Sequence, residues 1–367
     1  MTLQVGDWVE VRSQKEILGT LDARGELDGL PFMPEMFQYC GRRFQIYRRA
    51  HKTCDTVNQT GGRRLLDCVH LETRCSGDAH GGCQAACLLF WKTKWLRPVP
   101  GKNADSDLEP ALATASSSAS GQCQERHVWA AVRVEEPDGP RYVCQATELP
   151  RYTTPLPWWH VGQYVEDYTA GNVTAGQWLR AAVYAVYFNV AQSGLGLGRP
   201  LRWFYDRFQS LWGGLPYPRR RGQLPLDAPT PTGSLDLQPG ELVRIKSYEE
   251  ILATLNTANK NRGLYFDAEL VPFCGGTYRV KSRLTTFIDE KTGRMVTTKS
   301  PAILLEGVWC QARYSDCRML CPRSIHSWWR EIWLERVHPP AANTVDRWIP
   351  IALAEDAAAE GVCSSNG

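Results

Sequence analysis

The signatures that usually identify a reaction are missing from this 367-residue sequence. It contains no GxxxxGKS/T phosphate loop, no HExxH zinc motif, no GxSxG nucleophile elbow and no GxGxxG that follows a strand. The glycine-rich stretch GLGLGRP lies between two helical patterns, so we interpret it as a hinge and not as a phosphate cradle. The sequence therefore indicates no reaction class, and whether the protein is an enzyme stays open.

The chain also lacks a strong charge excess and a long apolar run. Its 42 Lys and Arg against 39 Asp and Glu leave a net charge of +3, which gives no general attraction to nucleic acid. The apolar stretch 178–190 contains Arg180 and Asn189 and is too short to span a bilayer. The opening MTLQVGDWVEVRSQKE has charged and polar residues where a signal peptide has an apolar run, so we expect a cytoplasmic protein.

Cysteine and tryptophan, in contrast, are abundant. Thirteen cysteines in a cytoplasmic protein are more often metal ligands or reactive thiols than disulfides. Fourteen tryptophans favour a role in binding, with a protein or polymer partner that the composition does not name.

A fixed numerical offset relates the two ends of the chain. Adding 234 to the numbers of Cys40, Cys83 and Cys87 gives Cys274, Cys317 and Cys321, and the pair Cys75 and Cys310 misses this offset by one. The segment 6–41 maps without a gap onto 240–275 and matches at 14 of 36 positions. We interpret the chain as a duplicated domain in which both copies keep a set of thiols.

Each copy predicts a strand, a short helix and several further short strands. Alternating apolar residues in GDWVEVRS indicate a strand, and Ser13 followed by apolar residues at helical spacing predicts a capped helix. The predicted fold class is α+β, mainly β, with two duplicated SH3-like small barrels and a helical insert between them. The predicted boundaries are a first repeat at 3–99, a disordered linker at 100–126, a strand-plus-helical-hairpin insert at 127–222, a linker at 223–239, a second repeat at 240–338 and a tail at 339–367.

The shared thiols have metal-ligand character. Cys83 and Cys87, like Cys317 and Cys321, are separated by three intervening positions, which on a helix or tight turn directs both sulfurs to one face. Four thiolates in each copy suit tetrahedral zinc, which we favour, and they equally match the ligand count of an iron–sulfur cluster. The alternative is that they are small buried side chains. The predicted metal ligands are Cys40, Cys75, Cys83, Cys87, Cys274, Cys310, Cys317 and Cys321.

Residues found in only one copy are the candidates for a specific activity. The first copy adds His51, Cys54, His70 and His80, and the HxxC pair of His51 and Cys54 is a candidate second ion site. A Cys/His site with an open position activates water in metalloenzymes, so a metalloenzyme is the second hypothesis. The sequence does not decide whether the cysteines outside the offset have a role; these are Cys54, Cys68, Cys123, Cys144 and Cys363.

Two further partners are open from the sequence. The helical region 174–221 ends in Arg219, Arg220 and Arg221 and carries Trp203 and Trp212, a pattern that also fits peripheral contact with an anionic membrane. The arginine pairs at 42–43, 48–49 and 63–64 interleave with aromatic residues, which makes nucleic-acid binding a third and less favoured hypothesis.

Five segments resemble a family of uncharacterised bacterial proteins associated with gene clusters for polysaccharide or specialised-metabolite biosynthesis. They are YCGRRFQIYRRAHKTCDT, HGGCQAACLLFWKTKWL, YTAGNV, CQARYSDCRMLCPRS and WREIWLERV. The resemblance implies a bacterial cytoplasmic accessory protein and carries over no activity, fold or catalytic residue.

The leading hypothesis from the repeated thiols is a binding or scaffold module stabilised by metal, because zinc would offset the small cores of such units.

Overall fold

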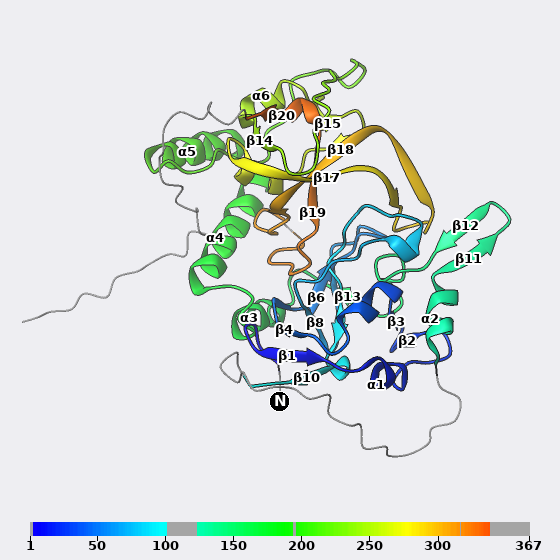
Figure 1. Ribbon diagram of the computed structural model, residues 1–367. Coiled ribbons are helices and arrows are strands. Elements are labelled where there is room, and N and C mark those ends of the chain that lie inside the picture. Colours follow the sequence, from blue (N-terminus) through cyan, green and yellow to red (C-terminus); the bar gives the residue numbers. More distant parts are fainter. Residues whose placement is uncertain (1–2, 101–122, 194–195, 316, 338–367) are drawn as a thin grey trace, which may run out of the picture.

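The computed structural model describes residues 3–100, 123–193, 196–315 and 317–337 (Figure 1). The predicted tail with Cys363 and most of the predicted linker 100–126 lie outside these residues. Helix α2 (Glu125–Ala131) begins inside the C-terminal end of that predicted linker.

The N-segment, residues 3–99, consists of short strands and single helical turns, of which those labelled η are 3-10 helices. Its elements are β1 (Trp8–Val11), α1 (Gln14–Leu18), β2 (Glu26–Leu27), β3 (Leu30–Pro31), η1 (Pro34–Tyr39), β4 (Arg43–Gln45), β5 (Arg48–Arg49), β6 (Lys52–Cys54), β7 (Gly62–Arg64), β8 (Cys68–His70), η2 (Asp78–His80), β9 (Trp91–Lys92), η3 (Thr93–Trp95) and β10 (Leu96–Pro98).

The C-segment, residues 240–337, contains the two long strands of the described structure. Its elements are β14 (Leu242–Ile245), α6 (Tyr248–Leu252), β15 (Lys260–Asn261), β16 (Leu264–Tyr265), η4 (Ala268–Phe273), β17 (Thr277–Ile288), β18 (Met295–Trp309), β19 (His326–Trp329), η5 (Glu331–Trp333) and β20 (Leu334–Arg336).

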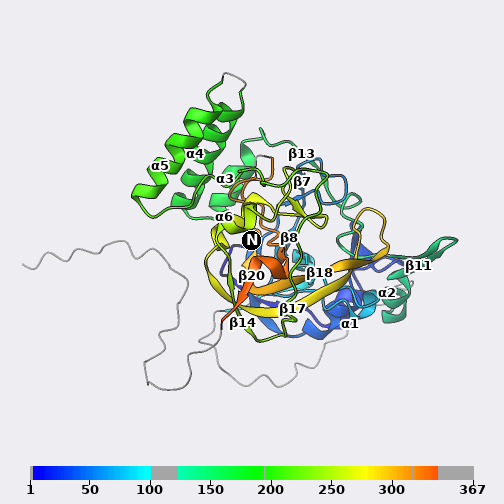
Figure 2. The same ribbon diagram turned by 90° about the horizontal axis from the view of Figure 1, so that it is seen from above.

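The middle of the chain supplies most of the helix. After α2 come β11 (Arg133–Glu136), β12 (Gly139–Tyr142), β13 (Thr154–Leu156), α3 (Gly162–Thr169), α4 (Ala175–Gln192) and α5 (Gly198–Leu211). Helices α3, α4 and α5 lie together on one side of the molecule in both views (Figures 1 and 2). Across the described residues, none of the helices has the length and apolar character needed to cross a membrane.

The elements of the two segments recur at the offset seen in the sequence. The bounds of β14, α6, β15, β16 and η4 equal those of β1, α1, β2, β3 and η1 plus 234, and the first position of β17 equals that of β4 plus 234. The same local signal starts both short helices, because Ser13 with Glu16 and Ser247 with Glu250 each form a capping box. Identical local chemistry thus produces identical local structure at both ends of the chain.

The sheets are small, antiparallel and open. The largest has the strand order β19-β18-β17-β14-β20 and lies in the C-segment, while β10-β1-β4 and β5-β8-β9 form two smaller sheets in the N-segment. No sheet in the described ranges closes on itself. The prediction of a mixed α+β, strand-rich chain is confirmed, but the structure does not show two SH3-like barrels. The N-segment strands are very short and are divided among separate small sheets, which leaves the closure of a barrel incomplete.

Among the described residues the two largest hydrophobic cores lie one in each segment. Trp91 and Trp95 are buried in the first, and the similarly placed Trp329 and Trp333 are buried in the second. Each core has an indole that donates to a threonine hydroxyl: Trp95 Nε1 to Thr20 Oγ1 at 3.0 Å, and Trp333 Nε1 to Thr254 Oγ1 at 2.9 Å. Val128 and Leu149 of the middle region join the first core.

Candidate metal centre

Three potential metal ligands of different chemistry converge in the N-segment. The carboxylate of Glu35, the thiol of Cys75 and the imidazole of His80 each offer a ligand atom, and these atoms all lie within 4.8 Å of one another. Glu35 Oε1 lies 2.7 Å from His80 Nδ1 and 3.8 Å from Cys75 Sγ. Within the described ranges this is the one set of three that converges so closely.

Glycines shape the loop that delivers two of these ligands. We call residues 75–87 the first cysteine loop; it holds η2 between Gly77 and Gly81, which adopt positive φ angles of 79° and 64°. A Cβ at Gly77 would lie 1.9 Å from the carbonyl oxygen of Cys83, and one at Gly81 would lie 2.3 Å from the Tyr142 hydroxyl. Only glycine accommodates both the backbone conformation and this close approach.

The hydrogen bonds of His80 and Glu35 suit a metal ligand pair. His80 Nε2 lies 3.1 Å from the carbonyl oxygen of Val143, to which it can donate, and His80 Nδ1 lies 2.7 Å from Glu35 Oε1. A metal ion would take the place of the proton that Nδ1 shares with Glu35. A backbone carbonyl that fixes the tautomer in this way is typical of metal-bound histidine. Glu35 Oε2 is buried without a hydrogen-bond partner, an unsatisfied acceptor that a cation would stabilise.

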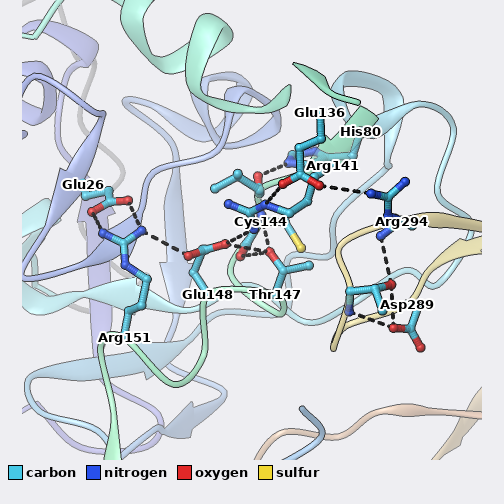
Figure 3. Close-up of polar contacts among 12 residues, drawn as sticks. Glu26, His80, Glu136, Arg141, Cys144, Thr147, Glu148, Arg151, Asp289 and Arg294 are labelled. Carbon is cyan, nitrogen blue, oxygen red and sulfur yellow. Dashed lines mark hydrogen bonds and ion pairs between the residues drawn. The ribbon is translucent and has the colours of Figure 1, made fainter. Parts of the chain in front are cut away.

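Further thiols line a cavity beside this set. Cys75, Cys83, Cys87 and Cys144 all contribute to its wall, together with His80. Cys144 comes from the middle region, where its backbone N–H donates to Thr147 Oγ1 at 3.0 Å, close to His80 in Figure 3. Ion pairs of Glu148 with Arg141 and Arg151 hold this turn in place (Figure 3).

Electrostatics keep these thiols neutral and the carboxyl charged. Burial raises the pKa of Cys75 and Cys87 far above the ordinary value, and it raises the pKa of Cys144 to about 11. Burial also acts to raise the pKa of Glu35, but the hydrogen bond and attraction of His80 outweigh it and lower that pKa below its usual range. A cation at this position would supply the charge that buried thiolates need.

A second group of thiols forms around residues 310–321, which we call the second cysteine loop and of which residue 316 is not described. Here Cys54 on β6 and Cys321 share a side-chain hydrogen bond. That hydrogen bond lowers the pKa of Cys54. Burial of the thiol acts to raise this pKa, and the nearby charges of Arg323 and Arg318 act to lower it. Burial raises the pKa of neighbouring Cys310.

The two loops dock reciprocally on the opposite segments. The first loop lies against β17, where Gln84 Oε1 accepts from Thr286 N at 3.0 Å and Ile288 N donates to Cys83 Sγ at 3.4 Å. The second loop lies against β6, where Lys52 Nζ donates to the carbonyl oxygen of Met319 at 2.9 Å. Ile288 is the counterpart of Cys54 at the 234 offset, so corresponding positions face the two loops.

A carboxylate anchors each loop at the same relative position. Glu35 Oε1 accepts from the backbone N–H of Ala79 at 3.2 Å. Glu269, its counterpart at the 234 offset, accepts from the backbone N–H groups of Arg313 at 2.9 Å and Tyr314 at 2.5 Å. The two loops differ at the next residue, because His80 in the first loop stands where the second loop has Tyr314 at the 234 offset. Three unlike ligand atoms therefore converge only in the N-segment among the described residues.

Cys40 and Cys274, which the offset predicts as ligands, have other surroundings. They cap the ends of η1 and η4 and pack against the first and second hydrophobic core, respectively. Neither belongs to the converging set or to the wall of the thiol-lined cavity. Burial raises the pKa of Cys40 to about 11 and that of Cys274 to about 12. The structure thus brings Cys75, Cys83 and Cys87 together without Cys40.

The predicted HxxC pair is not brought together. His51 Nε2 lies 3.1 Å from Asp167 Oδ1, toward helix α3, whereas Cys54 contacts the second cysteine loop. Residues three apart along an extended strand point to opposite faces, so His51 and Cys54 do not share an ion. Asp167 also accepts from Lys52 Nζ at 2.5 Å, and this buried group of three ties β6 to α3.

His70 has the surroundings of a structural residue. Its Nδ1 lies 2.8 Å from the carbonyl oxygen of Leu89, and its ring centroid lies 4.6 Å from that of Phe90. Burial lowers the pKa of His70 to about 3, so the ring is neutral at physiological pH. Of the four candidate catalytic residues, only His80 lies in the converging set.

Of the remaining cysteines, two are buried away from these groups. Cys68 Sγ lies 3.2 Å from the carbonyl oxygen of Leu66, and burial raises its pKa to about 12. Cys123 belongs to the first hydrophobic core.

Several of the predicted nucleic-acid-binding arginines have acidic partners. Arg49 and Arg64 both pair with Glu166, at 3.1 and 3.3 Å, and Arg43 pairs with Glu10 at 3.6 Å. Arg63 is buried and pairs with Asp55 at 3.3 Å. These pairs leave less positive charge for phosphate than the sequence pattern indicates.

The metal ligands predicted from the sequence include neither Cys144 nor Glu35. The signal for Glu35 was its recurrence as Glu269, whereas Cys144 lies outside the offset and has no sequence signal. No protein-family model matches the chain, and no curated protein matches it either.

Proposed function

We propose that this protein is a metal-binding module whose first centre is a zinc site formed by Glu35, Cys75 and His80. The carrying observation is the convergence of three unlike ligand atoms within 4.8 Å, beside a buried carboxylate oxygen that has no hydrogen-bond partner. Mixed sulfur, nitrogen and oxygen ligands suit zinc, which binds thiolate at about 2.3 Å and imidazole at about 2.0 Å. Calcium and magnesium would instead require mainly oxygen ligands.

The thiols of the adjoining cavity complete the coordination in this proposal. Zinc in structural sites is four-coordinate, and Cys83, Cys87 and Cys144 line the cavity next to the converging set. An iron–sulfur cluster is the alternative, because a cluster places its own atoms between cysteines and needs a thiol-lined space.

The role we assign to the metal is to stabilise a duplicated scaffold in the reducing cytoplasm. The proposal rests on the recurrence of element bounds at the 234 offset and on the two separate cores. We take the units to be 3–99 and 240–338, with the insert 127–222 between them, which lends Cys144 to the first unit. Metal binding contributes folding energy directly, which small cores of this kind require.

The test measures metal per chain by mass spectrometry of the purified full-length protein. We expect stoichiometric zinc in the wild type, and we expect Cys75→Ser and His80→Ala to lose about one equivalent, since each removes a ligand. A brown protein that contains iron and sulfide would show that the site holds an iron–sulfur cluster and not zinc.

The chain offers matched controls for this experiment. Glu35→Gln should reduce zinc, while Glu269→Gln, at the corresponding position of the C-segment, should leave the first site loaded. Unchanged metal content in Cys75→Ser and His80→Ala, with the fold intact by circular dichroism, would contradict the proposed site.

A metalloenzyme is the second candidate because of the same three ligands. Catalytic zinc keeps three protein ligands and one open position, which the Glu35, Cys75 and His80 set provides if no cavity thiol binds. Cobalt substitution separates the two: a spectrum that changes on addition of cyanide or azide indicates an open position, and an unresponsive spectrum indicates a closed structural site.

We also propose that α5 makes peripheral contact with the surface of an anionic membrane, without crossing it. None of the described residues of α5 is buried, and Trp203 and Phe208 are 69% and 51% exposed. Phe204, Phe208 and Trp212 follow one another at the spacing of one helical turn, with adjacent ring centroids 6.4 and 6.3 Å apart. Arg199, Arg202 and Arg207 lie on the same helix, and such a mixture of aromatic and basic residues favours the lipid headgroup layer.

Vesicle flotation tests this contact. The full chain should float with vesicles that contain phosphatidylserine, and Phe208→Ser combined with Trp212→Ser should abolish flotation. Trp159→Ser is the matched control, because Trp159 is 67% exposed but lies outside α5. Failure of the wild type to float, or equal flotation of all three proteins, would contradict membrane contact.

A further inference from the structure

The second cysteine loop approaches a thiol that belongs to the other end of the chain. Cys54 lies in the N-segment and Cys321 in the C-segment, yet their side chains share a hydrogen bond. Cys54 is 6% exposed, and its strand β6 runs next to β7 beneath the loop. The buried thiol of Cys54 and the half-buried thiol of Cys321 thus meet at the junction of the two segments.

Backbone geometry shows that the loop is seated closely on this strand pair. A Cβ built on Gly61, which has a φ of 109°, would lie 3.5 Å from Cys317 Cβ and 3.8 Å from its Sγ. On Gly62, a Cβ would lie 2.9 Å from the carbonyl oxygen of Leu156 on β13. The distances at Gly61 are those of ordinary van der Waals contact, so Cys317 lies against the chain next to Gly62, which pairs with Cys54 across the two strands.

Polar contacts on both sides fix this arrangement. Lys52 Nζ reaches the carbonyl oxygen of Met319 at 2.9 Å. Arg323, just after the loop, donates to Thr56 Oγ1 at 2.7 Å and to the carbonyl oxygen of Cys54 at 3.4 Å. Thr56 also donates to Glu290, its own counterpart at the 234 offset. Corresponding positions of the two segments thus meet each other here, as they do at a local two-fold axis.

We propose that Cys54, Cys310, Cys317 and Cys321 form a second, thiolate-only metal centre that joins the N-segment to the C-segment. Cys54 takes the place that the sequence offset assigns to Cys274. The centre takes a thiophilic metal, because thiolate sulfur selects such metals over hard cations. No three of these four described sulfurs lie within 4.8 Å of one another, so an iron–sulfur cluster, which places its own atoms between the cysteines, suits their spacing better than a single zinc ion. This inference extends the proposed function but does not depend on the Glu35, Cys75 and His80 site.

The two segments differ in the residue that is available as a fourth metal ligand. The residue that corresponds to Cys54 is Ile288, and its backbone N–H contacts Cys83 of the first loop. An isoleucine supplies no ligand, and Cys144 of the middle region lies at the wall of that cavity instead. The first centre is therefore contained in the N-segment and middle region, whereas the second links the two ends of the chain.

Metal analysis of ligand variants tests the second centre. Cys54→Ser and Cys321→Ser should each lose about one equivalent of metal. Combining Cys54→Ser with His80→Ala, which empties the first site, should lose both equivalents, whereas Cys75→Ser combined with His80→Ala should lose only one. Cys274→Ser and Cys68→Ser should leave the metal content unchanged. If Cys274→Ser loses the metal and Cys54→Ser keeps it, the assignment of Cys54 is wrong. Elemental analysis for zinc, iron and sulfide decides between the ion and the cluster.

Differential alkylation covers the case in which a serine variant fails to fold. The wild-type full chain is treated with iodoacetamide before and after removal of metal by a chelator, and each cysteine is quantified by peptide mass spectrometry. Cys54, Cys310, Cys317 and Cys321 should become reactive together, and Cys68 should stay protected as a buried control. Modification of Cys54 that is independent of Cys321 in the metal-loaded protein would overturn the proposal.

Discussion

The two cysteine loops are alike in construction and unlike in the partners they meet. Each loop carries three cysteines, receives a carboxylate from a preceding helical turn through backbone N–H groups, and docks on a strand of the opposite segment. The first loop adds His80 and faces Ile288, while the second has Tyr314 and faces Cys54. Shared residues build the loop, and the residues that differ decide which ligands are available.

Single substitutions offer ways to break this comparison. The expected effects range from the contact between the segments to the caps of the short helices. For the anchoring carboxylates and the helix caps, the corresponding residue in the other segment provides the comparison.

The largest effect should come from Asp167→Ala. Asp167 is fully buried and accepts from Lys52, which in turn holds Met319 of the second loop. The substitution leaves a buried, uncompensated ammonium group, at a cost of about 3–5 kcal/mol in the free energy of unfolding. Urea denaturation measures this cost, with Glu335→Ala as the control: its ion pair with Arg244 is half exposed and should contribute under about 1 kcal/mol. Equal small losses would show that Asp167 does not anchor the second loop.

Acid should destabilise both segments through one buried histidine in each. Burial lowers the pKa of His70 and of His326 to about 3, whereas an unfolded histidine titrates near 6.5. The contribution of each neutral, buried histidine to the free energy of unfolding is complete above pH 6.5 and is lost as pH falls toward 3. In that range the unfolded chain binds a proton on this histidine and the folded chain does not. Each histidine should contribute a slope of about 1.4 kcal/mol per pH unit in that window. Denaturation of His70→Gln between pH 6 and 4 should show one such slope removed, and an unchanged slope would contradict the buried neutral state.

Substitution of the anchoring carboxylates should separate metal binding from loop anchoring. Glu269→Gln keeps one acceptor for the two backbone N–H groups and should cost about 1–3 kcal/mol without changing the metal content of the first site. Glu35→Gln should lower the metal content as well. Calorimetry combined with metal analysis measures both effects. If the two variants behave alike, Glu35 is an anchor of the loop and not a ligand.

The smallest effect should be equal in the two segments. Ser13→Ala and Ser247→Ala each remove a capping hydrogen bond and should each cost about 1 kcal/mol. Thermal denaturation measures both, with the exposed Lys15→Ala as a neutral control. Costs that differ severalfold would show that the two short helices do not have the same environment.

Local features of the fold were predictable from the sequence because their causes are local. Ser13 and Glu16 indicate a capping box, and the alternation around Val9 and Val11 indicates a strand. Barrel closure was not predictable in this way, because it depends on pairings between strands that are distant in the sequence, such as β1 with β10 and β7 with β13. The sheets proved to be open where two barrels were expected.

The candidate site was predictable only in part. The spacing of Cys83 and Cys87 with Cys75 indicated a shared purpose, and the structure places all three at one cavity. The thiol that joins the three cysteines of each loop was not predictable. Cys144 and Cys54 are distant from their loops in the sequence, and neither has a cysteine counterpart at the 234 offset. Cys40 and Cys274 recur for a different reason: each caps a 3-10 turn at the edge of a core.

Native mass spectrometry of the full-length protein shows directly whether the cysteine loops hold metal. We expect a folded chain whose mass exceeds that of the polypeptide by two metal centres and falls to the polypeptide mass on acid denaturation. A folded chain, prepared without chelator and with its thiols unmodified, that has only the polypeptide mass would contradict it.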